Sequence, residues 1–593
     1  PNPARSMPYF MAPPPYTRDL ASATPMAIEP LAQTGSRVGV VVEGSLTAGL
    51  TAKLACPDQV EQMRVGKFVV VDGQQHRYFS LITDVQLHTT DGQVIADPPN
   101  DAFVRQVLAG TATYSTVLVS PMLMLAKGSQ EDVAGPQPVR SIPGHFSPVL
   151  DATDGDFSVV FGSEDAEHPD HFAIGMPLDN DVPLCLDLKR FVERSNGIFG
   201  KSGTGKSFLT RLILAGLIKK DVCSNLIFDM HSEYGWQGRS ETAAGGTVRG
   251  LKQLFPGSKV LIYTLDPKST LARGASYDAE VRISSSEITS EDILLLAHEL
   301  NLPPTVSETA HLLQRRFKQH WLKRLLDLEP ADLEDTAKEL GAHAGSLQAL
   351  YRKLLQLKRK SYIDWEERGA ADGTWESLSD ESPAQSQSVV KQILNAIVAK
   401  KHIVLEFGAH SDMLSYLLVA NILTRSIRAR YVEQTERYLA TQQAADAPRP
   451  LMITIEEAHK FLDPAVARDT TFGTLAREMR KYNVTLLVVD QRPSAIDSEV
   501  LSQVGTRMVC LLDDEKDVDS ILSGVSGATR LRSILATLET RGQAMLVGHA
   551  LPMPVVIRTR PYDDAFYAAV RGYESDEAMR EEMQRKMSRF ARR

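Results

Sequence analysis

The stretch GIFGKSGTGKSFLTRLILAGLI, residues 197–218, decides the fold class of this chain. A short apolar run comes first, then a glycine-rich loop, then a helical pattern of apolar residues. Such a loop lets backbone N–H groups turn inward around phosphate oxygens, and the positive end of the following helix adds to the attraction. In this motif the lysine, here Lys206, reaches the β- and γ-phosphates, and the hydroxyl of Ser207 ligates Mg²⁺.

The stretch therefore predicts a P-loop α/β fold that binds ATP with Mg²⁺. The residues predicted to contact the nucleotide are Gly200, Lys201, Ser202, Gly203, Thr204, Gly205, Lys206, Ser207 and Phe208.

Apolar runs of strand length continue on the C-terminal side of the loop and alternate with helical patterns. This alternation is typical of a parallel sheet, and runs without polar residues favour strands covered by helices on both faces. The predicted strands are 197–200, 225–230, 259–265, 402–408, 451–457, 484–491 and 507–513.

Two regions depart from this alternation. Residues 31–165 carry short β-branched runs separated by turn residues, which indicates a small β-barrel, with an edge sheet of the main domain as the alternative. Residues 286–388 show helical periodicity only and are predicted to be a helical insertion. The predicted domain plan is a flexible segment at 1–30, the barrel at 31–165, an ATPase core at 166–285 and 389–560 around the insertion, and a C-terminal brace with a basic tail at 561–593.

Acidic and amide side chains stand at the ends of two later strands. LMITIEEAH ends in Glu456 and Glu457, and VTLLVVDQ ends in Gln491. If the acidic strand neighbours the P-loop strand, Glu456 joins the Mg²⁺ shell and Glu457 orients or deprotonates the attacking water. Gln491 is then suited to sensing the γ-phosphate. The alternatives are a helix cap at Glu456–Glu457 and an ordinary turn at Gln491.

Arginines precede the last of these strands. Arg477 and Arg480 are three residues apart on one helical stretch, so they can share a face. One of them can act as an arginine finger in a neighbour's site, or both can belong to a solvated surface helix. Asp229, His231 and Glu233 follow a strand and are predicted to support the nucleotide pocket. Arg425, Arg428 and Arg430 are predicted to form a solvated helix face.

The composition sets bounds on partners and location. The net charge of −9 argues against simple DNA coating, so any DNA site must gather its positive charge locally. We expect no membrane span, because no run of eighteen or more apolar residues is present, and no secretory signal, because the first residues lack a basic region followed by an apolar stretch. Four scattered cysteines fit a reducing cytoplasm and favour neither disulfides nor a zinc site.

The ordered series GKSGTGKS, FDMHSEYG, EEAH, REMRKYN and DQRPS, together with the N-terminal barrel, resembles the HerA family of the FtsK-HerA branch of RecA-like ATPases. The resemblance runs from about residue 37 to residue 560. It implies a barrel of the HAS type, and a late segment, GQAMLVGHALPMPVVIRTRP, is similar to the family's closing hairpin and brace. The glutamate at position 456 departs from the aspartate usual in such motors.

The resemblance further implies an ATP-hydrolysing homohexamer that moves double-stranded DNA through its channel, as a translocase or helicase. It places Arg194 and Arg480 as residues that assist the nucleotide site, Arg480 from the neighbouring subunit. It implies a partner on the barrel, either a NurA-type nuclease in DNA end processing or an effector in anti-phage defence. Loops near 234–250 and 459–471 are the expected channel loops.

Two other functions stay open at this point. One is a nucleotide-gated scaffold that organises a partner enzyme, and the other is a conjugation- or secretion-type ATPase. Hydrolysis that is stimulated by duplex DNA favours the translocase.

Overall fold

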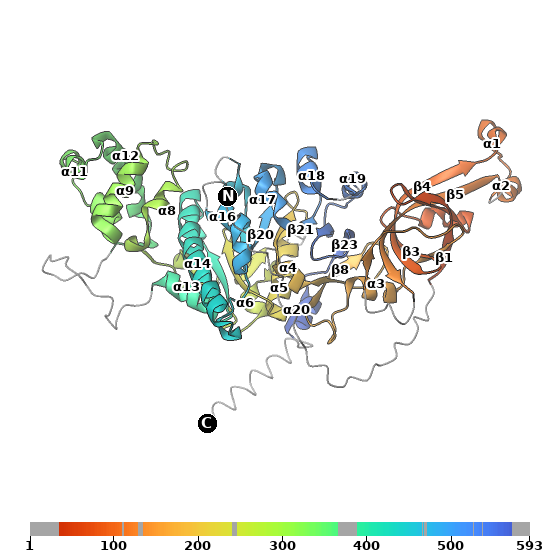
Figure 1. The fold of residues 1–593 in the computed structure, drawn as a ribbon, viewed down its shortest axis with the longest axis horizontal. Helices are drawn as coiled ribbons and strands as arrows, with labels where there is room; N and C mark the ends of the chain where they lie inside the picture. Colours follow the sequence, from red (N-terminus) through yellow and green to blue (C-terminus); the bar gives the residue numbers. More distant parts are fainter. Residues whose placement is uncertain are drawn as a thin grey trace, which may run out of the picture.

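The structure, a computed structural model, describes residues 35–109, 112–127, 135–239, 246–365, 388–464, 467, 471–525, 527–536 and 538–571. The predicted flexible segment at 1–30 and the basic tail after residue 571 lie outside these ranges, as do parts of the two expected channel loops. A central α/β body carries a β-barrel at one end and a helical insertion at the other (Figure 1).

The central body is built on one twelve-stranded sheet, and every predicted strand of the ATPase core is present in it. The strands β15 to β21 are parallel, whereas β21 to β9 pair antiparallel and extend the sheet beyond the predicted part. In spatial order the strands are β15 (Ala279–Glu280), β14 (Val260–Thr264), β18 (His402–Glu406), β11 (Ser224–Asp229), β19 (Leu451–Glu456), β20 (Val484–Asp490), β10 (Ser195–Phe199), β21 (Val504–Val509), β22 (Gln543–Gly548), β23 (Val555–Thr559), β8 (His171–Pro177) and β9 (Leu184–Asp187).

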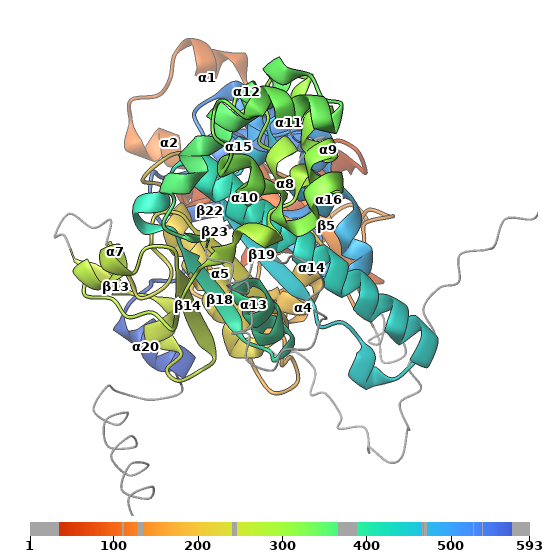
Figure 2. The same ribbon diagram turned by 90° about the vertical axis from the view of Figure 1, so that its left-hand side faces the viewer.

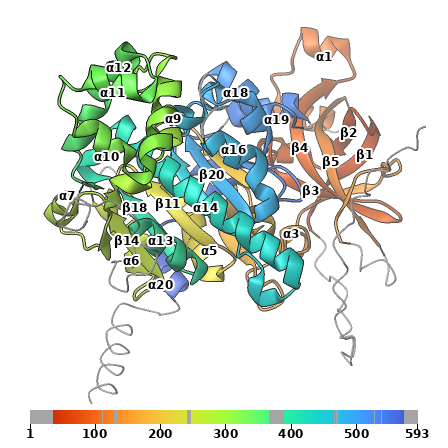
Figure 3. The same ribbon diagram turned by 60° about the vertical axis from the view of Figure 1, so that its left-hand side comes forward.

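Helices cover both faces of this sheet, as the apolar strands predict (Figure 3). Connections that run towards β14 place α5 and α6 on one face, and connections that run back towards β21 place α13, α14, α16 and α17 on the other, because such crossovers are right-handed. The helices of this body are α4 (Leu188–Val192), α5 (Lys206–Lys220), α6 (Leu251–Leu254), α7 (Pro267–Ala272), α13 (Val389–Val398), α14 (Met413–Thr441), α15 (His459–Leu462), α16 (Thr471–Glu478), α17 (Ser498–Ser502), α18 (Glu515–Leu522), α19 (Ala528–Ala536) and α20 (Asp564–Arg571).

The N-terminal strands close into a six-stranded barrel, which confirms the predicted barrel; the edge-sheet alternative is wrong. The closing pair is β2 with β5, and β6 extends the sheet by one short strand. Closure removes unpaired strand edges. In order around the barrel the strands are β2 (Gly49–Leu54), β1 (Arg37–Ser45), β7 (Pro148–Asp151), β3 (Phe68–Asp72), β4 (His76–Thr89) and β5 (Thr113–Ala126), with β6 at Gln137–Pro138.

The barrel packs against the central body through an aromatic cluster. Phe68 of β3 lies 5.3 Å, centroid to centroid, from Phe157 of α3 (Asp154–Phe161) and from Phe79 of β4. All three rings are buried in the cluster that also contains the sheet core. The barrel is therefore joined to the body by its outer face, while its interior is a separate apolar core.

The predicted helical insertion is present, and its described helices lie between residues 290 and 354; residues 366–387 of the predicted range 286–388 lie outside the described residues. It is entered by β16 (Ile283–Ser284) and left by β17 (Ile363–Asp364), which pair with each other and so close the insertion at its base. The helices between them bury Trp321 and a set of leucines. They are α8 (Ser290–Leu294), α9 (Val306–Phe317), α10 (Trp321–Leu326), α11 (Leu333–Leu340) and α12 (Ala344–Leu354), and they face the viewer in Figure 2.

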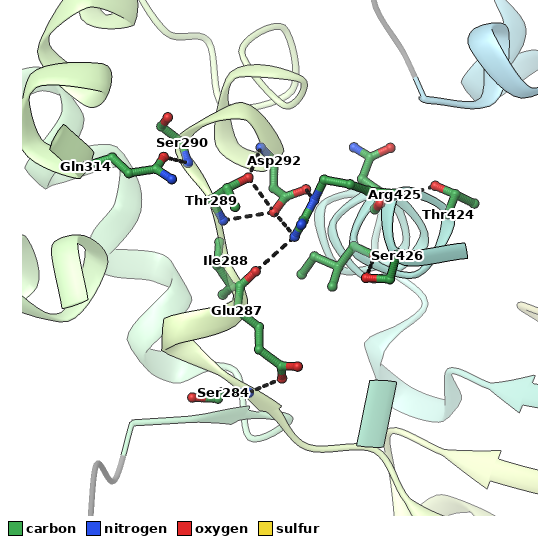
Figure 4. Close-up of polar contacts among 12 residues, drawn as sticks. Ser284, Glu287, Ile288, Thr289, Ser290, Asp292, Gln314, Thr424, Arg425 and Ser426 are labelled. Carbon is green, nitrogen blue, oxygen red and sulfur yellow. Dashed lines mark hydrogen bonds and ion pairs between the residues drawn. The ribbon is translucent and has the colours of Figure 1, made fainter. Parts of the chain in front are cut away.

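Arg425 corrects one prediction about α14. The sequence predicts that Arg425 is solvated, but its guanidinium donates to both carboxylate oxygens of Asp292, at 3.1 and 2.9 Å (Figure 4). It also donates to the Glu287 carbonyl at 3.0 Å. Asp292 is buried in α8, and its partner lies on a distant helix whose register the sequence does not reveal. Arg425 therefore fastens the insertion to the ATPase core.

Candidate active site

The P-loop spans Gly200–Gly205, between β10 and α5. Gly203 and Gly205 have φ of 78° and 101°, a region that favours glycine, so the loop can turn its amides inward. The Lys206 ammonium donates to the Lys201 carbonyl at 2.8 Å and thus lies over the loop. Thr204 is buried and donates to the same carbonyl at 2.7 Å.

The remaining loop residues leave the phosphate side open to solvent. Lys201 pairs with Asp513 beyond β21, and Ser202 is exposed. Phe208 packs edge-on against Tyr562, with ring centroids 6.2 Å apart, and so holds the first turn of α5 to the C-terminal segment. The glycines, the lysine and the open face are the features that a triphosphate requires.

The strand order corrects the predicted neighbour of the P-loop strand. The acidic strand β19 is not adjacent to β10, because β20 lies between them and pairs with both. All three strands are parallel, so their carboxyl ends still meet at the P-loop edge of the sheet. Glu456 and Glu457 therefore still lie at the P-loop edge of the sheet, but β20 separates their strand from β10.

Glu457 and Gln491 meet at this edge although they are 34 residues apart in the chain. The Gln491 side-chain amide donates to the Glu457 carboxylate at 3.1 Å. Glu457 has a φ of 48°, which is uncommon outside glycine and costs about 1 kcal/mol or more. Both residues come directly after their strands, so paired parallel strands bring them together.

Sequence reasoning missed His459 and Asp490, which extend this group. The His459 ring nitrogen Nδ1 lies 2.9 Å from the buried Asp490 carboxylate and 3.7 Å from that of Glu457. The hydrogen bond to Asp490 raises the pKa of His459. The sequence EEAH could have revealed His459, because a histidine two residues after Glu457 stays close to the end of the same strand.

The side chain of Glu456 points into the protein interior, where it lies near the buried carboxylate of Asp229. The Tyr234 hydroxyl donates to Glu456 at 2.6 Å, and the other Glu456 carboxylate oxygen is buried without a hydrogen bond. Burial and the nearby Asp229 raise the pKa of Glu456 to about 8. Asp229 accepts three backbone N–H groups from the loop 233–235, so it orders the loop that carries Tyr234. His231 is exposed at the start of this loop.

The three predicted arginines meet in one cavity of about 1260 Å³. Arg194 directly precedes β10, and its side chain packs on Gly505, where a Cβ would lie 2.7 Å from that of Arg194. Arg480 donates to the Glu193 carbonyl at 3.0 Å, and Arg477 donates to the Ala467 carbonyl at 3.4 Å.

This cavity is at the amino edge of the parallel strands, opposite the P-loop. The five residues of β10 separate Arg194 from the glycine-rich loop, and a strand of that length spans roughly 17 Å. Arg477 and Arg480 likewise precede β20, whereas Gln491 follows it. The structure therefore groups the arginines with one another and separates them from Lys206, Glu457 and Gln491 of the same chain.

The described part of the chain has neither a metal-ligand cluster nor a membrane-spanning helix. In it no group of three or more His, Cys, Asp or Glu side chains is arranged to hold a metal ion. Nor does any helix of the described ranges have the length and apolarity to cross a membrane.

Comparisons with known proteins show which family this chain is similar to. The family model described as the helicase HerA, central domain, matches residues 172–427. A DNA double-strand break repair helicase HerA of Sulfolobus acidocaldarius is 22% identical over 537 residues, which are 88% of this chain and 93% of the relative. The protein of the same name from Pyrococcus furiosus is 23% identical over 428 residues, 69% of this chain and 72% of the relative.

Among solved structures, the chain is similar to VirB4 of Thermoanaerobacter pseudethanolicus, with a TM-score of 0.39 and 15% identity over 66% of this chain and 96% of that chain. The family model and the named relatives confirm the resemblance that the motifs predict: residues 172–427 match the central domain of the HerA helicases, which are P-loop ATPases, and the chain is similar to named HerA helicases over most of its length.

Proposed function

We propose that this HerA-type ATPase forms a ring, a homohexamer, and drives double-stranded DNA through the channel by ATP hydrolysis. One observation carries the ring: the arginine cavity and the P-loop lie at opposite edges of one sheet. An arginine that contacts the nucleotide from that cavity must come from another copy of the chain. In a closed, head-to-tail ring, one surface of each subunit contacts a different surface of the next subunit, so the two surfaces must lie on opposite sides of the subunit.

At the P-loop edge, each predicted residue has a role that its position supports. Lys206 exchanges its contact with the Lys201 carbonyl for the β- and γ-phosphates. Glu457 accepts a proton from the attacking water, and Gln491, which already donates to Glu457, holds that carboxylate in place. Loss of the γ-phosphate then changes the surroundings of Gln491 and reports hydrolysis to residues after β20.

The residues also fit Mg²⁺ as the ion that travels with the triphosphate. Mg²⁺ takes only one or two protein ligands and completes its shell with phosphates and water, so no dedicated cluster is needed. Ser207 stands on the first turn of α5, and Glu456 has a buried oxygen without a hydrogen bond. Ser207 would ligate the ion, and Glu456 would act through water. The bound ion would neutralise developing phosphate charge.

DNA as the cargo is supported by the relatives, which are named as DNA double-strand break repair helicases. The net charge of −9 is compatible with this cargo when six copies gather cations along a channel. We also propose a protein partner on the barrel, a nuclease of the NurA type or a defence effector, and a cytoplasmic location, which suits three buried free thiols.

The ring is tested by mixing two inactive variants. Lys206→Ala removes the phosphate contact, and Arg480→Ala removes the arginine offered to a neighbour. A mixed ring contains interfaces that join an intact P-loop to an intact Arg480, so we expect ATPase activity of about one quarter of wild type from an equal mixture. Mixing Lys206→Ala with Glu457→Gln is the matched control. Both substitutions lie at the P-loop edge, so every subunit of the mixture has a damaged nucleotide site and no interface should regain ATPase activity.

Mixed assembly is verified by affinity-tagging one variant and recovering the other. Rescue by Arg477→Ala or Arg194→Ala mixtures identifies which arginines act across the interface. Absence of rescue in verified mixed assemblies would show that Arg480 does not act in trans.

A further inference from the structure

Exposed apolar side chains concentrate on the barrel domain. Among the described residues, most of the large apolar side chains that are exposed lie between residues 35 and 162, and only four are scattered over the rest of the structure. Contiguous exposed apolar surface in a soluble protein marks an interaction site. The barrel residues are Leu46, Val65, Leu87, Ile95, Phe103, Val104, Val107, Ile142, Phe146 and Val159.

One group of these residues forms an arm, residues 84–113. The strands β4 and β5 continue past the barrel as a hairpin, and α1 (Gly92–Ala96) and α2 (Ala102–Leu108) lie at its tip, away from the central body (Figures 1 and 3). Asp101 caps α2 by accepting the amides of Phe103 and Val104 at 2.8 and 3.1 Å.

The helix α2 is apolar, yet none of its residues is buried. Phe103 is 73% exposed and Val107 55% exposed, and their spacing of four places them on one face. A short helix has little stability of its own in water and is held by burying such a face. Among the residues that the structure describes, no surface of the same chain covers the apolar face of the arm.

The second group lies at the opposite end of the barrel and forms the loop patch, residues 136–148. Its loop is fixed by contacts to Val41 and Tyr78: the Phe146 amide donates to the Val41 carbonyl at 2.8 Å, and the Ser141 and Tyr78 hydroxyls are 2.9 Å apart. Phe146 is 74% exposed and has a φ of 64°, so the backbone is strained at a residue whose ring points into solvent.

The charges of the two surfaces are complementary. The arm carries four aspartates against one arginine, whereas the loop patch carries Arg140 and His145 and no acidic residue. Strand register puts them at opposite ends of the barrel, because Thr89 pairs with Thr113 at the arm while His76 pairs with Ala126 beside the β3–β4 turn that contacts the patch. Two different, complementary surfaces on opposite ends describe a head-to-tail contact.

We propose that the arm of one subunit docks on the loop patch of the next copy of this chain, so that the barrels form a ring of their own. Phe103 and Val107 of the arm pack against Ile142 and Phe146 of the neighbour, and the arm aspartates face Arg140. The inference rests on the proposed ring and names the contact that links its barrels.

The test compares the full-length wild-type chain with three variants, without nucleotide, by mass photometry across a range of concentrations. The arm variant is Phe103→Asp with Val107→Asp, the patch variant is Phe146→Asp, and Leu439→Asp is the control at an equally exposed apolar site on α14. We expect both interface variants to need at least about tenfold more protein for half-assembly, and the control to stay within twofold of wild type. Binding of a fluorescent ATP analogue verifies that each variant is folded.

Mixing the arm variant with the patch variant gives the sharper readout. In the mixture the intact arm of the patch variant can dock on the intact patch of the arm variant, but the reverse contact is lost. At concentrations where neither variant assembles alone, species of two chains should therefore accumulate in place of rings. Assembly of each variant at the wild-type concentration, in a protein that does form rings, would overturn the docking proposal and leave the proposed function intact. Loss of only a co-purifying second protein would assign the arm to that partner and also overturn the proposal. A wild type that stays monomeric with ATP and DNA would instead defeat the proposed ring itself.

Discussion

Glu457 occupies a backbone conformation that most side chains avoid. Its φ of 48° is a cost that the surrounding contacts must offset. In return the chain turns sharply after β19, and the carboxylate lies within hydrogen-bond distance of Gln491. This conformation brings the Glu457 carboxylate to the side-chain amide of Gln491. The strained backbone therefore serves the hydrolytic role that we propose for Glu457.

Glu457→Gln should leave ATP binding within about twofold of wild type and lower the turnover rate by at least about 100-fold, since a general base typically contributes that much. The amide keeps the size of the side chain but cannot accept the proton of water. Filter binding of labelled ATP and phosphate release measure the two quantities separately. Normal turnover would remove Glu457 from the proposed mechanism.

Glu456 gives a prediction about pH and stability. Its pKa is near 4.5 unfolded and about 8 folded, so folding favours the neutral acid. That stabilisation is complete below pH 4.5 and is lost as the pH rises through 8. Glu456→Gln is neutral at every pH and can still accept the Tyr234 hydroxyl. Without nucleotide or Mg²⁺, its unfolding free energy should exceed that of wild type by an amount that grows from pH 5 to pH 8, reaching at least about 1 kcal/mol.

The matched control is Glu436→Gln on the exposed face of α14. Its difference from wild type should not depend on pH over the same interval. Parallel melting curves for wild type and Glu456→Gln across pH 5–8 would refute the raised pKa.

At the residue scale, the sequence predicts side chains that follow a strand directly. Lys206, Glu457 and Gln491 stand at strand or loop ends that apolar runs reveal. The sequence did not predict the pairing of His459 with Asp490, because Asp490 is the last residue of β20 whereas His459 follows β19. Such contacts depend on which strands are neighbours, and a single sequence does not contain that information.

At the element scale, periodicity predicted strands and helices well, because apolar alternation reflects burial directly. It could not predict strand order, so β19 was expected beside β10 when β20 lies between them. It also missed β8 and β9, which precede the P-loop in the chain and yet extend the far edge of the sheet. Long-range pairing depends on packing of whole layers, which local patterns do not record.

The junction of α8 with α14 supplies a prediction at this scale. Arg425→Ala leaves the buried Asp292 carboxylate without its cation, although Thr289 still donates to it. Because Arg425 is itself 40% exposed, we expect a loss of roughly 1–3 kcal/mol in unfolding free energy. Hydrogen exchange should rise in residues 284–300 and stay unchanged in β10.

Arg428→Ala is the control for this junction, since Arg428 is half-exposed and pairs with Glu478 only at 3.8 Å. It should lower the unfolding free energy by less than about 0.5 kcal/mol. Equal exchange in the insertion for both variants would show that Arg425 does not hold it.

At the scale of the whole molecule, two pairs of surfaces face opposite ways. In the core the P-loop and the arginine cavity lie at opposite edges of the sheet, and in the barrel the arm and the loop patch lie at opposite ends. In the proposed ring, a single subunit would supply half of each contact at both layers. Head-to-tail assembly would satisfy both layers at once and would enclose a channel whose lining can differ in charge from the outer surface.

This organisation predicts how DNA acts on hydrolysis. In the proposed ring, a chain with a net charge of −9 would attract DNA through cations gathered in the channel. Contacts to phosphates depend steeply on salt and carry no sequence information. Duplex DNA should raise the ATPase rate equally for two unrelated sequences of one length. The stimulation should fall at least about tenfold between 50 and 200 mM salt, while the rate without DNA changes less than twofold. The two rates are measured by phosphate release over the same salt series. Turnover indifferent to DNA at every salt concentration would favour a scaffold or a secretion-type ATPase, since in those proteins hydrolysis is not coupled to a duplex in the channel.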